Sequence, residues 1–279
     1  MFAAEPDPAL VARLRAAGSV FAEREAKLLI AEAAGDRGRL EALVRRREDG
    51  EPLEVVVGWA ELAGARVALE PGVFVPRERS ELLVAEAVVE LDRIEGGGTG
   101  SAMSGRTGGA TVLDLCCGSG AVAAAIATAR PGIELHAADL DRAAVDLATR
   151  NLARFGARVH RGDLFDAPPA GLRGGFDLIV ANSPYVPSGE LELMPREARL
   201  YEPPWALDGG ADGLDPLRRI TAAAPDWLRP GGAVLVEAAA EAATAGAAIV
   251  TSAGLAARIA RSQPLEVAVV IGVIAGRPL

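Results

Sequence analysis

Short apolar runs alternate with helix-like stretches through the second half of the chain, and this alternation constrains the fold most. Helices are expected over residues 121–129 and 141–155, and strands over 111–115, 133–137, 157–160, 176–181 and 233–237. Repeated strand–helix units predict a parallel sheet with helices on both faces. Two further apolar runs have no helix between them, at 255–259 and 267–273. They predict a terminal hairpin with an antiparallel last strand, in an α/β fold that is otherwise mostly parallel.

The first part of the chain has a different pattern. Residues 8–47 show helical spacing, whereas 53–57 and 65–69 look like two short strands joined by a turn near Gly64. Ser80 could cap a helix over 81–94. A Gly-rich stretch follows, without periodic apolar residues. The expected division is a small helical domain at 1–52, a β-hairpin and connecting helix at 53–95, a flexible linker at 96–109 and the α/β domain at 110–279.

Composition and charge exclude several classes of protein. Acidic residues outnumber basic ones by 38 to 29, which disfavours stable binding to nucleic acid. No charge-free apolar run of 18 residues and no signal peptide is visible, so we expect no membrane association. Cys116 and Cys117 are adjacent, and a bridge between them would be strained; a chain without disulfides suits the cytoplasm. These two cysteines, together with His136 and His160, do not have the spacing of metal ligands, so no metal site is predicted. The oligomeric state stays open.

The first chemical motif is a glycine turn between the first strand and helix of the α/β region, Asp114-Leu-Cys-Cys-Gly118-Ser-Gly120. Glycines let the backbone approach a ligand closely. Asp139 ends the next strand, 19 residues after Gly120, where a carboxylate can accept both hydroxyls of a ribose. Asp163 follows the third strand, in a position to meet an adenine amino group. These groups share the carboxyl edge of the sheet, where open α/β folds bind ligands.

Two nucleotide-type ligands fit this turn. Gly118-x-Gly120-x-x-Ala123 also matches a relaxed nicotinamide-dinucleotide pattern, and a glycine turn can serve packing alone. Asp114, however, places a carboxylate four residues before Gly118. The methionine part of S-adenosylmethionine carries an ammonium group that such a carboxylate would hold, and the dinucleotide has none. The turn therefore favours S-adenosylmethionine.

The second motif is Asn182-Ser183-Pro184-Tyr185, directly after the fourth strand of that region. The Asn182 side-chain oxygen and the Ser183 carbonyl can each accept one N–H of an NH2 group, and the Tyr185 ring can stack on a flat amide or base. An amide nitrogen is a poor nucleophile, because its lone pair is delocalised. Holding both hydrogens in tetrahedral directions favours attack on a methyl sulfonium by orientation and electrostatics, without an obvious base.

These motifs resemble the class I S-adenosylmethionine-dependent methyltransferases, and more narrowly the HemK-like release-factor glutamine methyltransferase family. The resemblance runs from about Gly50 to Glu237. Besides the two motifs it includes Gly50-Glu-Pro-Leu53, Val75-Pro-Arg77, Ala138-Asp139, Gly162-Asp-Leu-Phe165, Tyr201-Glu-Pro203 and Gly209-Gly-Ala-Asp-Gly-Leu214. It implies a Rossmann-like sheet of the class I type, preceded by helices and a hairpin. The last block is more specific than the glycine turn.

The resemblance also implies an activity: methyl transfer to the glutamine amide of a Gly-Gly-Gln tripeptide in a peptide-chain release factor, docked by the helical part. The four residues Asn182 to Tyr185 would hold that amide, with Asn182 also touching the cofactor. The other cofactor contacts that we expect are Asp114, Cys116, Cys117, Gly118, Ser119, Gly120, Asp139, Leu140, Asp163 and Leu164.

The chain departs from the family pattern at two site positions. Ser183 replaces the first of two usual prolines, and Leu164 stands where the family often has an aromatic residue beside the adenine. Three alternatives accompany the main interpretation: methylation of an exocyclic amine in nucleic acid, methylation of a small amide, and a cofactor-binding protein without catalysis. An oxidoreductase is disfavoured, because no hydride-transfer residues present themselves.

Overall fold

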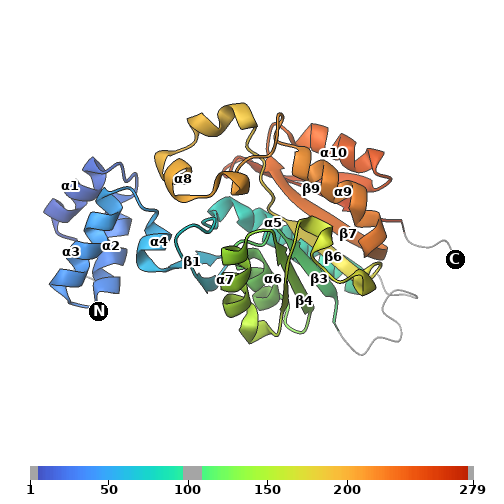
Figure 1. Cartoon of the computed structure of the whole chain (residues 1–279), viewed down its shortest axis with the longest axis horizontal. Helices are drawn as coiled ribbons and strands as arrows, with labels where there is room; N and C mark the ends of the chain where they lie inside the picture. Colours follow the sequence, from blue (N-terminus) through green and yellow to red (C-terminus); the bar gives the residue numbers. More distant parts are fainter. Residues whose placement is uncertain (1–5, 97–108, 276–279) are drawn as a thin grey trace.

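The computed structural model describes residues 6–96 and 109–275. The N-terminal part forms a small helical bundle to one side of the sheet (Figure 1). Leu14, Leu29 and Val44 are fully buried in its core. Asp7 and Asp36 cap two of its helices with side-chain hydrogen bonds to backbone amides. The predicted helices are confirmed as α1 (Pro8–Ala16), α2 (Ala22–Ala33) and α3 (Arg37–Glu48).

The strand predicted at 53–57 is wrong, because these residues form the short helix α4 (Leu53–Val57). Pro52 precedes the helix with an extended conformation, and Gly58 ends it with a φ of +83°. The run of valines suggested a strand, but packing decides the conformation here. Val56 is buried against the helical bundle and Val55 against the core of the sheet domain.

The hairpin follows α4 and is shorter than predicted. Its strands are β1 (Trp59–Leu62) and β2 (Ala65–Ala68), which pair antiparallel with Leu62 opposite Ala65. Ala63 and Gly64 both have positive φ, as a two-residue hairpin turn requires, so the predicted turn near Gly64 is confirmed. The helix predicted over 81–94 is observed as α5 (Glu81–Gly96). The predicted linker 96–109 lies almost wholly outside the described residues, and the domain division stays a prediction.

The α/β region is a seven-stranded sheet in the order β5-β4-β3-β6-β7-β9-β8. The first five strands in that order are parallel, and β9 is antiparallel to both neighbours, as predicted. The strands are β3 (Thr111–Leu115), β4 (Glu134–Asp139), β5 (Arg158–Arg161), β6 (Phe176–Ala181), β7 (Leu228–Ala239), β8 (Ala256–Ser262) and β9 (Val267–Val273). Residues 230–232 lie inside β7, beside a register shift against β6.

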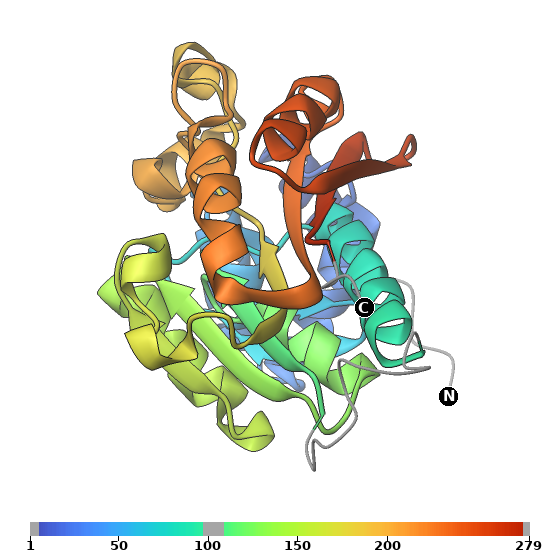
Figure 2. The same ribbon diagram turned by 90° about the vertical axis from the view of Figure 1, so that its right-hand side faces the viewer.

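Helices cover both faces of the sheet, because side chains alternate along each strand. Val112, Leu178 and Leu235 face one core, and Leu113, Ile179 and Val234 face the other. Figure 2 shows α5 and α9 on either side of β7. The first core is covered by α5, α6 (Ala121–Ala129) and α7 (Arg142–Leu152), and the second by α9 (Asp215–Trp227) and α10 (Ala243–Ser252).

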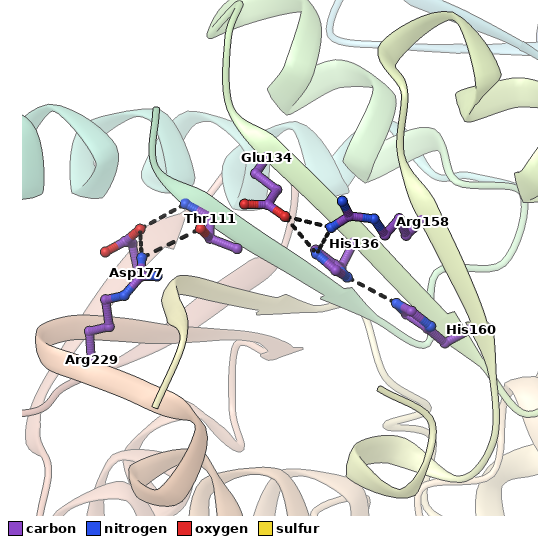
Figure 3. Close-up of polar contacts among 7 residues, drawn as sticks. All are labelled: Thr111, Glu134, His136, Arg158, His160, Asp177 and Arg229. Atoms are coloured by element: carbon purple, nitrogen blue, oxygen red, sulfur yellow. Dashed lines mark hydrogen bonds and ion pairs between the residues drawn. The ribbon is translucent and has the colours of Figure 1, made fainter. Parts of the chain in front are cut away.

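Polar contacts join the strands near their amino ends (Figure 3). The buried Asp177 carboxylate accepts the backbone N–H of Thr111 at 2.7 Å and a guanidinium N–H of Arg229 at 2.6 Å. His136 and His160 share a hydrogen bond of 2.9 Å between their rings on β4 and β5. These contacts fix the strand register at the edge opposite the carboxyl ends. None of the described helices is long and apolar enough to span a membrane.

Candidate functional site

A cavity of about 220 Å³ opens at the carboxyl ends of the central parallel strands. A small recess adjoins it, and Cys116, Gly118 and Asn182 line both. The recess is also lined by Asp114, Cys117 and Ser119. The cavity itself is also lined by Asp139, Leu140, Asp163 and Leu164. The structure thus brings together every predicted cofactor residue except Gly120.

Gly120 has a packing role instead. It adopts a φ of +79° at the start of α6, and a Cβ there would lie 3.0 Å from Leu152 and 3.4 Å from Ala148. Both neighbours belong to α7. Glycine at this position therefore lets α6 and α7 approach each other closely beneath the turn.

Gly118 is the glycine that faces the cavity. Its φ is +54°, and a Cβ built on it would meet no described atom within 4 Å. Its backbone N–H donates to Asp139 Oδ2 at 2.8 Å, while Asp139 Oδ1 accepts the backbone N–H of Asp141 at 2.9 Å. Burial raises the pKa of the Asp139 carboxyl, against the effect of these hydrogen bonds. The turn leaves an open cradle beside a carboxyl group that is held in place.

Asp114 lies at the bottom of the recess and is almost completely buried. Its Oδ2 accepts the backbone N–H of Ala123 in α6 at 3.1 Å. Burial raises the pKa of this carboxyl to about 8. Such a group gains most from a cationic partner, because a positive charge would compensate for the lost hydration of the carboxylate. The geometry fits the expected ammonium group.

Asn151 holds the hairpin against the glycine turn. Its Nδ2 donates to the carbonyls of Ser119 and Ala68, both at 2.9 Å, and its Oδ1 accepts the N–H of Ala68 at 2.9 Å. The hairpin is thereby fixed beside the cavity.

The outer end of the cavity contains residues that sequence reasoning missed. Asp163, which was expected to meet an adenine, accepts an Arg219 guanidinium N–H at 2.7 Å. Trp205 also lines the cavity and is 59% exposed. No sequence pattern pointed to Trp205, because it belongs to an irregular connection.

The second motif, Asn182 to Tyr185, lies between the cavity and a second, narrow recess. Asn182 lines the cavity and also this narrow recess shared with Ser183, Pro184 and Tyr185. Its Nδ2 donates to Ser80 Oγ at 3.0 Å. The hydroxyl of Tyr185 donates to Glu237 Oε1 at 3.2 Å, and the guanidinium of Arg79 lies 5.5 Å from the centre of the Tyr185 ring. Burial raises the pKa of the Tyr185 hydroxyl.

Ser80 and Glu237 were not predicted as site residues. Ser80 was expected only to cap a helix, and Glu237 only marked the end of an apolar strand. Both side chains are about 1% exposed. A glutamate inside an otherwise apolar strand at the ligand edge was the signal that could have found Glu237, because buried carboxylates need partners.

A wide groove of about 1080 Å³ begins beyond Tyr185. Arg77 and Arg79 line both this groove and the narrow recess, so the two spaces adjoin. The groove is bounded by the connection after β6 and by the turn between β8 and β9, and its lining is mixed in charge. It includes Arg77, Arg79 and Arg261 together with Glu190, Glu197, Glu241 and Glu266.

One wall of the groove is fixed by a buried ion pair between two motif blocks. Arg77, from the segment after the hairpin, pairs with Glu202, whose side chain is fully buried. Burial raises the pKa of Glu202, while Arg77 lowers it. Next to it, the Tyr201 hydroxyl donates to the Asp49 carbonyl at 3.1 Å. The connection after β6 therefore contacts both the hairpin segment and the N-terminal bundle.

Comparisons with known proteins agree with this architecture. The methyltransferase small domain family matches residues 101–198. A release factor glutamine methyltransferase from Geobacter sulfurreducens is 41% identical over 70% of this chain and 63% of its own length. The chain thus spans less than two thirds of that relative. A 4-amino-L-phenylalanine/4-methylamino-L-phenylalanine methyltransferase from Streptomyces pristinaespiralis is 38% identical over 70% of this chain and 63% of its own.

A further relative is matched over most of its length. This release factor glutamine methyltransferase from Mycolicibacterium smegmatis is 37% identical over 82% of this chain and 82% of its own. That alignment extends well beyond the nucleotide-binding half of the α/β region. The chain therefore belongs to the release factor glutamine methyltransferase family.

Proposed function

We propose that the protein transfers a methyl group from S-adenosylmethionine to the side-chain amide nitrogen of a glutamine in a peptide-chain release factor. One observation carries the proposal: Asn182 stands in the wall shared by the ligand cavity and the recess that leads to the groove. A methyl donor on one side and an acceptor on the other would meet at this side chain. Release factors act in the cytoplasm, so we place the reaction there.

The residues of the cavity fit S-adenosylmethionine. Asp114 offers the ammonium end a buried carboxyl that already accepts one hydrogen bond, from the Ala123 amide. The open cradle at Gly118 leaves room for the ligand beside Asp139. Asp139 is placed to accept ribose hydroxyls, and Leu140, Leu164 and Trp205 offer apolar surface to the base. When bound, the cofactor supplies an electrophilic methyl group on a sulfonium centre.

The chain contributes orientation rather than an acid or a base. Asn182 Oδ1 and the Ser183 carbonyl would each accept one N–H of the acceptor amide, which localises the nitrogen lone pair toward the donor. Ser183 can do this as well as proline, because the contact is made by its backbone. The Tyr185 ring, fixed through its hydroxyl by Glu237, would stack on the amide plane.

The groove suits a protein segment better than a nucleic acid. Its lining combines three arginines with four glutamates, whereas a surface that binds phosphates would be mainly basic. Its volume of about 1080 Å³ would leave room for a loop that inserts one side chain into the adjoining recess. We propose that the N-terminal bundle and the connection after β6 dock the rest of the substrate, because they contact each other at Tyr201 and Asp49.

A second candidate acceptor is a small aromatic amine. The relative from Streptomyces pristinaespiralis is named for methylation of 4-amino-L-phenylalanine and is as similar over this region as several of the other relatives. A small acceptor would need the recess beside Tyr185 but not the groove. The two candidates therefore predict different effects of changes in the groove.

The test is a radiolabelled methyl-transfer assay. Purified release factors would be compared with variants in which the glutamine of the Gly-Gly-Gln loop is alanine, and 4-amino-L-phenylalanine would be offered in parallel. Calorimetric titration with S-adenosylmethionine would provide the binding control. Label on the unchanged factors alone supports the proposal. Label on the amino acid alone would favour the second candidate, and binding without label on either would contradict both.

A further inference from the structure

Two buried side chains near the Asn182 amide do not line the recess of the proposed acceptor, although Ser80 lines the small recess beside Asp114. Ser80 precedes α5 and Glu237 lies on β7, and both are about 1% exposed. Ser80 Oγ accepts from Asn182 Nδ2, and Glu237 Oε1 accepts from the Tyr185 hydroxyl. Ser80 also interacts with the Glu237 carboxyl and acts to lower its pKa, against the larger effect of burial, which raises it.

The chemistry of these groups fixes the direction of each hydrogen bond. The Tyr185 hydroxyl donates to Glu237, and Ser80 lowers the pKa of that carboxyl, as a hydroxyl does when it directs its O–H group toward a carboxylate. Ser80 Oγ then has only lone pairs left for Asn182. The amide must therefore present its NH2 group to Ser80, and its Oδ1 must point away. A reversed amide would place Oδ1 against Ser80 lone pairs.

We propose that Ser80 and Glu237 are positioning residues that fix the orientation of the Asn182 amide, so that Oδ1 faces the acceptor nitrogen. The proposal rests on the proposed function, because that function requires Asn182 to accept an N–H. A reversed amide would present a donor to a donor, and the acceptor would lose one of its two hydrogen bonds. The same carboxylate fixes Tyr185, so one buried charge orients both groups that would hold the acceptor.

Arg79 is the nearby cation that helps keep Glu237 ionised. Its charge lowers the pKa of Glu237, although the residue is not in direct hydrogen-bond contact with it. The second carboxylate oxygen, Oε2, has no hydrogen-bond partner among the described residues. A buried carboxylate with an unused acceptor position is costly for stability. A role in orienting the site accounts for that cost.

The test uses the full-length protein and the variants Ser80→Ala, Ser80→Thr and Glu237→Gln. Thr221→Val is the matched control, because Thr221 is a buried hydroxyl on α9 that bonds the Leu217 and Arg218 carbonyls of its own helix and lies outside the site. The first readout is independent of methyl transfer. The side-chain NH2 resonances of Asn182, identified by their loss in Asn182→Asp, are followed by nitrogen–proton NMR and solvent exchange.

We expect slow exchange of one Asn182 amide proton in the unchanged protein and in Ser80→Thr. Exchange should become at least about 10-fold faster in Ser80→Ala, because the hydrogen-bond acceptor is gone. Glu237→Gln should show two sets of Asn182 resonances or faster exchange. A glutamine amide can donate to Ser80, so the Ser80 hydroxyl would no longer have to point toward residue 237. Unchanged exchange in both Ser80→Ala and Glu237→Gln would overturn the proposal.

The second readout is kinetic. Ser80→Ala and Glu237→Gln should lower kcat about 10- to 100-fold, with the Kd of S-adenosylmethionine within about threefold, and Ser80→Thr should restore most of kcat. Equal losses in kcat, cofactor affinity and Tm, without rescue by threonine, would indicate a merely structural role and contradict the proposal. If the unchanged protein transfers no methyl group, the proposed function fails while the exchange measurement still decides the orientation of Asn182.

Discussion

Asn182 donates a hydrogen bond of 3.0 Å to Ser80, a residue 102 positions earlier in the chain. The bond joins the carboxyl end of β6 to the start of α5, so the candidate acceptor site is built jointly by the sheet and the segment after the hairpin. Phe74, from that same segment, lines the ligand cavity and both recesses. The segment after the hairpin therefore forms part of the site.

Asn182→Ala should remove most turnover while leaving cofactor binding largely intact. The side chain lies between the cavity and the recess, and its polar atoms are directed to Ser80 and the proposed acceptor. Loss of one hydrogen bond made in the transition state typically lowers kcat about 100- to 1000-fold. The measurement combines single-turnover methyl transfer with calorimetric titration of S-adenosylmethionine. Equal loss of turnover and affinity would count against this division of roles.

Asp139→Ala should instead weaken cofactor binding first. The Asp139 carboxyl holds the Gly118 amide and lines the cavity, far from the groove side of Asn182. Removing its ribose contacts and the support of the turn should raise the cofactor Kd by about 10- to 100-fold. At saturating cofactor, kcat should recover to within about fivefold of the unchanged protein. A low kcat that saturation does not restore would show that Asp139 acts in the chemical step.

Much of the α/β core could be predicted from the sequence, because its strands are short apolar runs bounded by clear turns. The observed bounds of β3, α6 and β6 are those predicted. The five residues of α4 were misread, since the burial of Val55 and Val56 in two cores overrides strand propensity. The positions of Asn182 and Asp139 followed from the parallel sheet. The hydrogen bond from Asn182 to Ser80 and the places of Glu237 and Trp205 at the site did not, because packing of distant segments creates them.

The ion pair of Arg77 with Glu202 should contribute strongly to stability when one partner is removed. Arg77→Met leaves a fully buried carboxylate without its cation and should lower the free energy of unfolding by about 3 kcal/mol. Arg77→Met combined with Glu202→Gln should recover at least half of that loss, because no unpaired charge remains. Chemical denaturation of the three variants measures both effects. Additive losses in the double variant would show that the two residues are not coupled.

Asp114 should make the stability of the cofactor-free protein fall as the pH rises. Its folded pKa is about 8, well above that of an unfolded aspartate, because burial disfavours the charged form. The stabilisation that comes from this raised pKa is fully present below the unfolded pKa near 4. It is lost as the pH rises through the folded pKa of about 8. Asp114→Asn stays neutral, so its Tm relative to the unchanged protein should increase between pH 6 and pH 9.

Cofactor affinity should depend on pH in the opposite direction to stability, which gives a second test of Asp114. The Asp114→Asn variant lacks the carboxylate that would meet the ammonium group, so S-adenosylmethionine should bind it at least about 10-fold more weakly at pH 8. In the unchanged protein, affinity should rise with pH as Asp114 ionises. An affinity in Asp114→Asn equal to that of the unchanged protein would remove Asp114 from the binding site.

Trp205 should report cofactor binding through its fluorescence. The chain has three tryptophans, and Trp205 is the one that lines the ligand cavity, where it is 59% exposed. A base placed beside it would displace water from the indole and change its emission. Titration with S-adenosylhomocysteine should therefore alter the spectrum of the unchanged protein and of Trp59→Phe, whose tryptophan packs against Arg66 in the hairpin. Trp205→Phe should lose the change and bind about threefold more weakly. A full fluorescence response in Trp205→Phe would place the base elsewhere in the cavity.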